Sequence, residues 1–505
     1  MSRLAVIHTR ARVALQAPSV LVEVHLSAGL PGLNIVGLPE AAVRESKDRV
    51  RSALINSGYE FPDGRITVNL APADLPKEGS RFDLPIALGI LVASGQLPQN
   101  SIEQREFLGE LALTGQLRPV AGILTASMAC GSIKTEMVVP WQNAGLAALV
   151  SDTQVIGARS LLEVCGYIAG KSAIKIASAP QPSIPINYPD MADVRGQTQA
   201  KRALEAAAAG GHHTLLFGPP GTGKTMLASR LPGILPPLTE SEALEVAAIH
   251  SLSAHVPVSN WKQRPFRTPH HSSSAVSLVG GGSFPRPGEI TFAHYGVLFL
   301  DEIPEFQRQA LEMLREPLEC GEVVITRARG QECFPAKFQL VAAMNPCPCG
   351  YQGDHRRECS CSPEQLARYR NKLSGPLLDR IDLQIEVASQ KTETILFAEP
   401  EVNSETRNSA QIRHSVISAR SKQLHRQGKI NAALSASELQ QYCQLGSKET
   451  QFITRICDKL CYSARAVHRI LRVARTLADL DSSERVLKSH LAEAVQYRKL
   501  DRQSK

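Results

Sequence analysis

The chain has 505 residues, of which 43% are hydrophobic and 21% charged, and these proportions fit a folded globular protein and exclude a disordered one. No apolar run approaches the ~18 residues that a membrane-spanning helix needs, and the first residues are too weakly apolar for a secretion signal, so we expect a cytoplasmic protein without a membrane partner. The net charge of +8 permits a polyanionic partner without requiring one. The length is sufficient for about two to four domains, and disulfide bonds are not expected in the cytoplasm.

Residues 1–175 carry the pattern of one α/β domain. Apolar and polar residues alternate over 22–26 and 66–70, which predicts two strands with one buried face each. Asp83 precedes the apolar run 84–94 and is expected to be the N-cap of a buried helix.

Two stretches of this domain, Pro76-Lys77-Glu78-Gly79 and the glycine-rich run 109–122, resemble the Lon-like domain of Lon proteases and of the DNA-repair ATPase RadA. Lon proteases use a serine–lysine dyad, and the resemblance places Arg81 near the serine position and Leu124 at the lysine position. Ser80 is adjacent, but a serine without a positioned base is a weak nucleophile. The resemblance therefore implies a Lon-like scaffold or oligomerisation platform, with peptidase activity as the alternative.

A proline-rich linker over 176–190 leads to a core expected over 191–394. In this core a β-type run at 214–217 precedes a glycine-rich loop, and a helix follows, which is the context of a phosphate-binding P-loop. The backbone N–H groups of such a loop and the helix N-terminus both favour bound phosphate. Lys224 is expected to reach the β- and γ-phosphates of ATP, and Thr225 to hold Mg²⁺. The predicted nucleotide-binding residues are Gly218, Pro219, Pro220, Gly221, Thr222, Gly223, Lys224, Thr225 and Met226.

Two further apolar runs end in polar residues, as buried parallel strands do at the edge that binds ligands. Run 297–300 ends at Asp301 and Glu302, which are expected to hold Mg²⁺ through water and to polarise the attacking water. Run 340–344 ends at Asn345, which could orient that water, although an asparagine there is commonly a turn residue. Arg380 and Arg465 lie downstream, where each could meet a phosphate or simply face solvent.

The order of these residues is similar to that of AAA+ ATPases. The resemblance implies that Asn345 is sensor 1, that Arg465 is the sensor 2 arginine, and that Arg380 is an arginine finger reaching the ATP of a neighbouring subunit in a ring. The segment 267–290 resembles the helix-2 insertion of the magnesium-chelatase-like branch. Together with the Lon-like domain, the chain resembles the ComM/YifB family, which implies a hexameric ring that moves DNA branches in homologous recombination during natural transformation.

A hairpin is predicted between Gly321 and residue 340, with β-type residues to about Thr326, Gly330 at the turn, and a second strand over 334–340. The resemblance assigns it as the presensor-1 hairpin, which projects into the pore of related helicases. Arg327 and Arg329 lie near its tip, where they would pair with phosphates of single-stranded or branched DNA, or with water. His270 and His271 could line the same pore or be structural.

Four of the eleven cysteines lie within fifteen residues, in the order Cys347-Pro348-Cys349 and Cys359-Ser360-Cys361. Two close pairs of thiols joined by a short polar loop suit a tetrahedral Zn²⁺ site, with His355 as a substitute ligand. The alternative is a set of free surface thiols. The expected role of the metal is structural.

Residues 395–505 read as a helical lid domain that begins near the nucleotide with Arg465. Basic residues without acids occupy 407–429 and predict either a solvated helix face or a contact with nucleic acid. The sequence as a whole predicts an α/β AAA+ P-loop ATPase with a helical lid, using ATP and Mg²⁺ to move DNA. Two alternatives stay open: a magnesium-chelatase-type motor subunit, and an ATP-dependent protein remodeller or protease.

Overall fold

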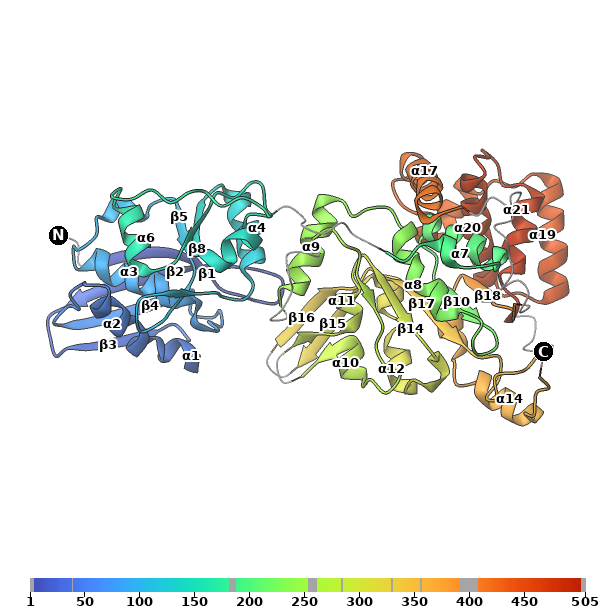
Figure 1. The fold of residues 1–505 in the computed structure, drawn as a ribbon, viewed down its shortest axis with the longest axis horizontal. Helices are drawn as coiled ribbons and strands as arrows, with labels where there is room; N and C mark the ends of the chain where they lie inside the picture. The colour runs from blue at the N-terminus through green and yellow to red at the C-terminus, as the bar shows by residue number, and fades with distance from the viewer. Residues whose placement is uncertain are drawn as a thin grey trace. The chain divides into compact units, whose positions relative to one another are not determined.

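The computed structural model describes residues 4–38, 40–180, 188–252, 261–282, 285–327, 330–354, 357–390 and 407–500. It contains two compact units, drawn in Figure 1: Met1–Pro185 with Glu240–Trp261, and Ile186–Thr239 with Lys262–Lys505. The stretch Glu240–Trp261 thus clusters with the first unit although it lies inside the range expected for the ATPase core. Among the described residues no helix is long and apolar enough to cross a membrane.

The first unit is built on a mixed seven-stranded sheet. In spatial order its strands are β3 (Gly32–Val36), β4 (Arg65–Ala71), β2 (Ser19–Ser27), β1 (Leu4–Arg10), β5 (Arg105–Phe107), β8 (Glu136–Pro140) and β9 (Val155–Ala158). The β1–β2 and β2–β4 pairs are antiparallel and the others parallel. The two strands predicted from alternation are confirmed as parts of β2 and β4.

Helix α3 (Asp83–Ala93) is buried along its whole length and packs across β1 and β2. The prediction that Asp83 caps this helix is wrong, because Phe82 is the N-cap residue and Asp83 is the first helical residue. The Asp83 carboxylate instead accepts hydrogen bonds from Arg49 and from the N–H of Leu111. The other helices of the unit are α1 (Ala41–Arg44), α2 (Ser46–Asn56), α4 (Ile123–Ile133), α5 (Trp141–Ala147), α6 (Leu161–Ile168) and α9 (Glu240–His250).

The second unit is built on a five-stranded parallel sheet. Its strands, in spatial order, are β11 (Phe266–Arg267), β14 (Val297–Leu300), β17 (Gln339–Met344), β10 (Thr214–Phe217) and β18 (Leu383–Glu386). Because all strands run the same way, the residues that follow β10, β14 and β17 meet at one edge of the sheet. The helices around this sheet include α7 (Thr198–Gly210), α8 (Lys224–Ile234), α10 (Ala275–Val279), α11 (Glu289–Phe292), α12 (Arg308–Met313), α13 (Pro317–Cys320), α14 (Pro363–Arg370) and α15 (Gly375–Leu378).

The predicted hairpin is present as β15 (Glu322–Arg327) and β16 (Gly330–Pro335), an antiparallel pair in which Arg327 lies opposite Gly330. The predicted bounds of its second strand are wrong. Strand β16 ends at Pro335, and the chain then enters β17 of the parallel sheet. Val323, Ile325 and Phe334 are buried and hold the base of the hairpin on the unit.

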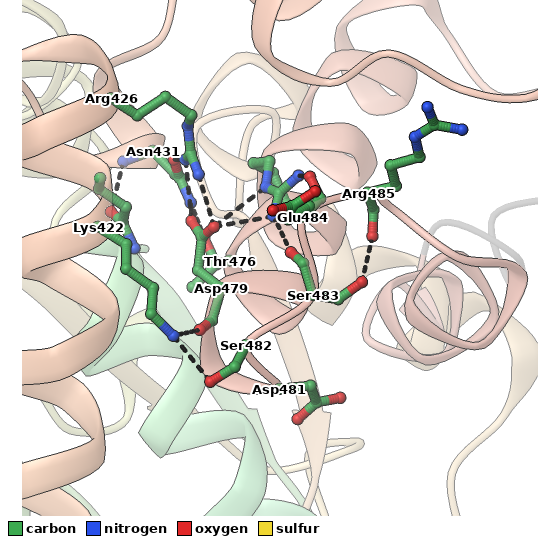
Figure 2. A network of polar contacts seen from close by, with 12 residues as sticks. Lys422, Arg426, Asn431, Thr476, Asp479, Asp481, Ser482, Ser483, Glu484 and Arg485 are labelled. Atoms are coloured by element: carbon green, nitrogen blue, oxygen red, sulfur yellow. Dashed lines mark hydrogen bonds and ion pairs between the residues drawn. The ribbon is translucent and has the colours of Figure 1, made fainter.

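The C-terminal part is helical, as predicted: α17 (Ser409–Gln427), α18 (Ala436–Tyr442), α19 (Ser447–Leu460), α20 (Ala464–Leu480) and α21 (Lys488–Gln496). Helices α17 and α20 pack on α7 (Figure 1). A buried carboxylate, Asp479, ties them together. It accepts hydrogen bonds from Arg426 of α17, at 2.6 Å and 2.9 Å, and from Asn431, at 2.8 Å. Figure 2 shows the three side chains facing one another.

The basic run of α17 has a structural role that the sequence did not predict. Arg407 pairs with Glu205 at 2.8 Å, Arg420 donates to the carbonyl of Ala208, and Lys429 pairs with Glu438 at 2.7 Å. Arg407 lies just before α17, Arg420 within it and Lys429 just after it, and all three are bonded inside the chain. This argues against a basic run that is free to bind nucleic acid.

Candidate nucleotide site and metal centre

The P-loop connects β10 to α8, as predicted. Gly221 and Gly223 take left-handed backbone conformations, with φ of 75° and 89°, and a Cβ at Gly221 would meet no atom within 4 Å. A side chain there would therefore project into the open cradle that a phosphate needs. Gly218 is required for another reason, because a Cβ would lie 2.2 Å from the carbonyl oxygen of Val387.

Lys224 lies at the first turn of α8 and is almost fully buried. Its amine donates to the carbonyls of Gly218, at 2.7 Å, and Pro219, at 2.9 Å, and to Oδ1 of Asn345, at 3.2 Å. Burial lowers the pKa of Lys224, while the charges of Asp301 and Glu302 oppose that shift. The side chain is thus held at the loop by groups that a phosphate oxygen can replace.

The predicted magnesium ligands are in contact. The Thr225 hydroxyl donates to Oδ2 of Asp301 at 2.9 Å, which joins the start of α8 to the end of β14. A hydroxyl and a carboxylate at this spacing are the hard oxygen donors that Mg²⁺ takes beside a nucleotide. The residues present therefore fit Mg²⁺-bound ATP.

Glu302 follows directly and has a left-handed backbone, with φ of 50°. Its carboxylate is about half exposed and lies 3.8 Å from Nδ1 of His271. The sequence placed His271 in a pore or a structural loop and missed this neighbour. The sequence offered one signal for this contact. His271 follows β11, the parallel neighbour of β14, and adjacent parallel strands end at the same edge of the sheet.

Arg380 and Arg465 lie together, apart from the P-loop. Both line a cavity of about 140 Å³ with Glu319, Asp379, His468, Arg469 and Arg472. Arg380 pairs with Glu319 at 2.5 Å, and Arg465 is 3.8 Å from Asp379. Within the described ranges, neither arginine forms a hydrogen bond or ion pair with the P-loop, Asp301, Glu302 or Asn345.

Sequence reasoning missed the other cations of this cavity. Arg469 and Arg472 lie four and seven residues after Arg465 on α20, and His468 lies three residues after Arg465 and four before Arg472, so the four side chains share a helix face. The spacing is visible in the sequence, but it points to a site only because the structure places Arg380 beside these side chains. The result is a concentrated positive site on the second unit.

Of the two predicted DNA contacts, the structure describes one. Arg327 is the last residue of β15, and Arg329 lies outside the described residues. Their contact with DNA stays a prediction.

The cysteine cluster is assembled. The sulfur atoms of Cys347, Cys349, Cys359 and Cys361 all lie within 4.8 Å of one another. Three of the Sγ–Sγ distances are 3.3, 3.5 and 3.7 Å. A tetrahedral site with Zn–S bonds of about 2.3 Å has S–S edges of about 3.8 Å, so the four thiols match its size. The N–H of Tyr351 lowers the pKa of Cys349, whereas burial raises the pKa of Cys347. His355 lies outside the described residues.

The Lon-like stretch holds no serine–lysine pair at the predicted position. Ser80 hydrogen-bonds to the carboxylate of Glu110, and Leu124 is fully buried in the core. Arg81 is buried and donates to the carbonyl of Ala121, and burial lowers its pKa to about 10. This arrangement suits a structural domain.

Family models of known proteins match residues in both units. The family described as magnesium chelatase, subunit ChlI, matches residues 190–395, its C-terminal family matches 406–498, and a family described as subunit ChlI of Mg-chelatase matches 22–143. The competence protein ComM of Haemophilus influenzae is 51% identical over 99% of this chain and 98% of its own length. A YifB protein of Salmonella typhimurium is 50% identical over the same shares.

Lon protease 2 of Bacillus subtilis is 28% identical over 31% of the chain and 32% of its own length, which agrees with a Lon-like domain. The AAA+ fold of the magnesium-chelatase type supports an ATPase that uses ATP and Mg²⁺, and proteins of this type commonly form oligomers. The chain belongs to the ComM/YifB family, with a Lon-like N-terminal domain and a magnesium-chelatase-like AAA+ core.

Proposed function

We propose that this protein is an ATP-driven DNA motor that works as a homohexameric ring and moves branches in incoming DNA during natural transformation. The relative named as a competence protein supports the biological setting. Lys224 binds the phosphates, Thr225 and Asp301 hold Mg²⁺, Glu302 polarises the attacking water and Asn345 orients it. Bound Mg²⁺–ATP supplies the phosphoanhydride bond whose hydrolysis drives movement.

The observation that supports assembly into a ring is the cavity lined by Arg380 and Arg465. Four arginines and one histidine meet two carboxylates there, and Arg469 also pairs with the buried Asp382 at 2.5 Å, so the arginines outnumber the acids by one. Among the described residues, none of these side chains bonds to the chain's own P-loop, which supports an anion supplied by a neighbouring subunit, its ATP. We infer that both arginines act on that neighbouring ATP.

The magnesium-chelatase families that match most of the chain make a metal-chelation motor the second candidate. A protein remodeller is less well supported, because Ser80 is bonded to a carboxylate and has no lysine amine as its partner. Stimulation of ATP hydrolysis by DNA separates the DNA motor from both.

The test is the ATPase rate of the purified protein with no DNA, with single-stranded DNA and with branched DNA. We expect strong stimulation that is lost in an Arg327→Ala, Arg329→Ala double variant, with basal hydrolysis retained. The double variant should also lower the slope of log affinity against log salt by about 2, one for each lost phosphate contact. Arg455→Ala, Lys459→Ala on the exposed face of α19 removes the same charge and should leave stimulation intact. Equal rates with and without DNA would reject the DNA motor.

We also infer that Cys347, Cys349, Cys359 and Cys361 bind one structural Zn²⁺. The size of the cluster and its four sulfur donors support this ion, which prefers tetrahedral thiolate sites.

A further inference from the structure

The cysteine loop is in direct contact with the nucleotide site at two places. Its first cysteine, Cys347, comes two residues after Asn345, whose amide oxygen lies 3.2 Å from the amine of Lys224. Within the loop, Gly350 takes a left-handed conformation, with φ of 86°, and faces Pro220 of the P-loop. A Cβ at Gly350 would lie 2.9 Å from Cδ of Pro220, so the Gly350 backbone packs against the proline ring at a distance that leaves no room for a side chain.

Besides the contacts among the four sulfur atoms, scattered hydrogen bonds and a cation–π contact of Arg357 with the Tyr351 ring hold the described residues of this loop. The stretch from Asn345 to Ser362 has no helix or strand among its described residues. The N–H groups of Gly350 and Gln352 donate to the carbonyl and the sulfur of Cys347, and Arg370 of α14 donates to the side chain of Gln352. Only Cys347 of the four cysteines is fully buried. The loop therefore lacks a core of its own, and its conformation depends on what joins the four sulfur atoms.

We propose that Zn²⁺ on the four cysteines holds Gly350 against Pro220 and so keeps the P-loop in the conformation that binds nucleotide. This proposal rests on the zinc site inferred above. It assigns the metal a second role, since zinc occupancy sets the affinity for nucleotide as well as the fold of the loop.

The physical reason is a population effect. When the loop is free, Pro220 loses the surface it packs on, and the P-loop takes its binding conformation in only a fraction of molecules. The apparent dissociation constant rises by the inverse of that fraction, about tenfold if one molecule in ten is competent.

The experiment uses the full chain and measures two quantities separately: zinc per chain by elemental analysis, and the affinity for a fluorescent ADP analogue with Mg²⁺ in excess. Zinc is removed with a chelator that spares Mg²⁺ and is then added back. We expect one zinc per chain, about tenfold weaker ADP binding after its removal, and recovery on return. Cys359→Ser, Cys361→Ser should bind ADP as weakly as the zinc-free protein, while Cys320→Ser, Cys333→Ser, at exposed thiols outside the cluster, should match the wild type.

Gly350→Ala tests the contact without touching a ligand. It should keep its zinc and still bind ADP more weakly, because its methyl group pushes the loop away from Pro220. Unchanged ADP affinity in a protein shown to have lost its zinc would overturn the proposal and leave a purely structural zinc site. If the protein contains no zinc when purified and still binds ADP tightly, the zinc site itself would also be rejected. Neither result depends on DNA, so the motor proposal is tested separately.

Discussion

His213 shows how one partly buried side chain makes this fold sensitive to pH. It lies just before β10, and its Nδ1 accepts a hydrogen bond from the N–H of Leu340 in β17 at 3.1 Å. Burial is the main cause that lowers the pKa of His213 to about 4. Asp382 opposes the shift, and Arg469 and His212 add to it. The neutral ring is therefore part of the folded state.

The pKa of His213 is lower in the folded chain than in the unfolded chain, where it is about 6.5. The unfolded chain then binds more protons between pH 6.5 and 4, so the free energy of unfolding falls as the pH is lowered through this window. His213→Asn keeps an acceptor for Leu340 but cannot titrate. Between pH 7 and 4.5 we expect the unfolding free energy of the variant to fall by up to about 3 kcal/mol less than that of the wild type. The urea midpoint of the variant should fall correspondingly less. His414→Asn, at an exposed position of α17, should follow the wild type. Parallel curves for wild type and His213→Asn would contradict this role.

At the scale of single residues, the sequence predicted most of what depends on local spacing. The P-loop and the cysteine pairs are short motifs, and the ends of β14 and β17 were visible as apolar runs that stop at polar residues. The contacts of His271 with Glu302 and of Gly350 with Pro220 were not predicted. Each joins segments that meet only because separate strands end at one edge of the sheet, and no local pattern encodes that meeting.

At the scale of elements, the C-terminal helices depend on one buried carboxylate. Asp479 is 2% exposed and faces Arg426 and Asn431 (Figure 2), and Arg475 also donates a hydrogen bond to it. Arg475 lies on α20 one turn before Asp479, and Arg426 lies on α17, so the carboxylate joins two helices. Opposite charges in this setting hold each other in place, and the loss of one leaves the others buried without a partner.

Asp479→Ala should therefore lower the opening free energy of α17 and α20 by about 3–5 kcal/mol. Hydrogen exchange of the amides in these helices measures that free energy locally, without requiring the whole chain to unfold in one step. Glu386→Ala removes an exposed carboxylate that pairs with Lys499, and it should change the exchange by less than about 1 kcal/mol. Similar exchange in both variants would show that the carboxylate does not brace the helices.

Elements were predicted well where one face is apolar, and poorly at their ends. The hairpin was found, but its second strand was displaced toward β17, because the sequence over 334–344 gives no sign of where one sheet stops and the next begins. The prediction that Asp83 is an N-cap was wrong for a related reason. An aspartate before an apolar run is a good cap, but here Arg49 and the N–H of Leu111 bind its carboxylate instead.

At the scale of the whole molecule, the sequence predicted the two kinds of fold, and the structure groups one further segment, Glu240–Trp261, with the first unit. Helix α9 clusters with the first unit because Leu124, Val150 and Ala248 share one hydrophobic cluster. Nothing in the local pattern of α9 distinguishes a helix that returns to the first domain from one that stays in the ATPase core.

The ring account predicts which inactive variants can rescue each other. Arg380→Ala and Lys224→Ala should each be inactive as pure rings, yet an equal mixture should regain activity at about a quarter of its interfaces, where an intact P-loop meets intact arginines. If Arg465 also acts on the neighbouring ATP, Arg465→Ala should be rescued by Lys224→Ala but not by Arg380→Ala. Rescue of Arg465→Ala by Arg380→Ala would instead place Arg465 at the ATP of its own subunit.

The most direct test of the central claim is movement of DNA. A labelled branched junction is incubated with the wild type, with Lys224→Ala and with Glu302→Gln, and its resolution into products is followed with time. We predict resolution by the wild type only when ATP is hydrolysed, with Glu302→Gln binding ATP and leaving the junction in place. A wild-type protein that hydrolyses ATP on branched DNA without moving the branch would contradict the account of a DNA motor.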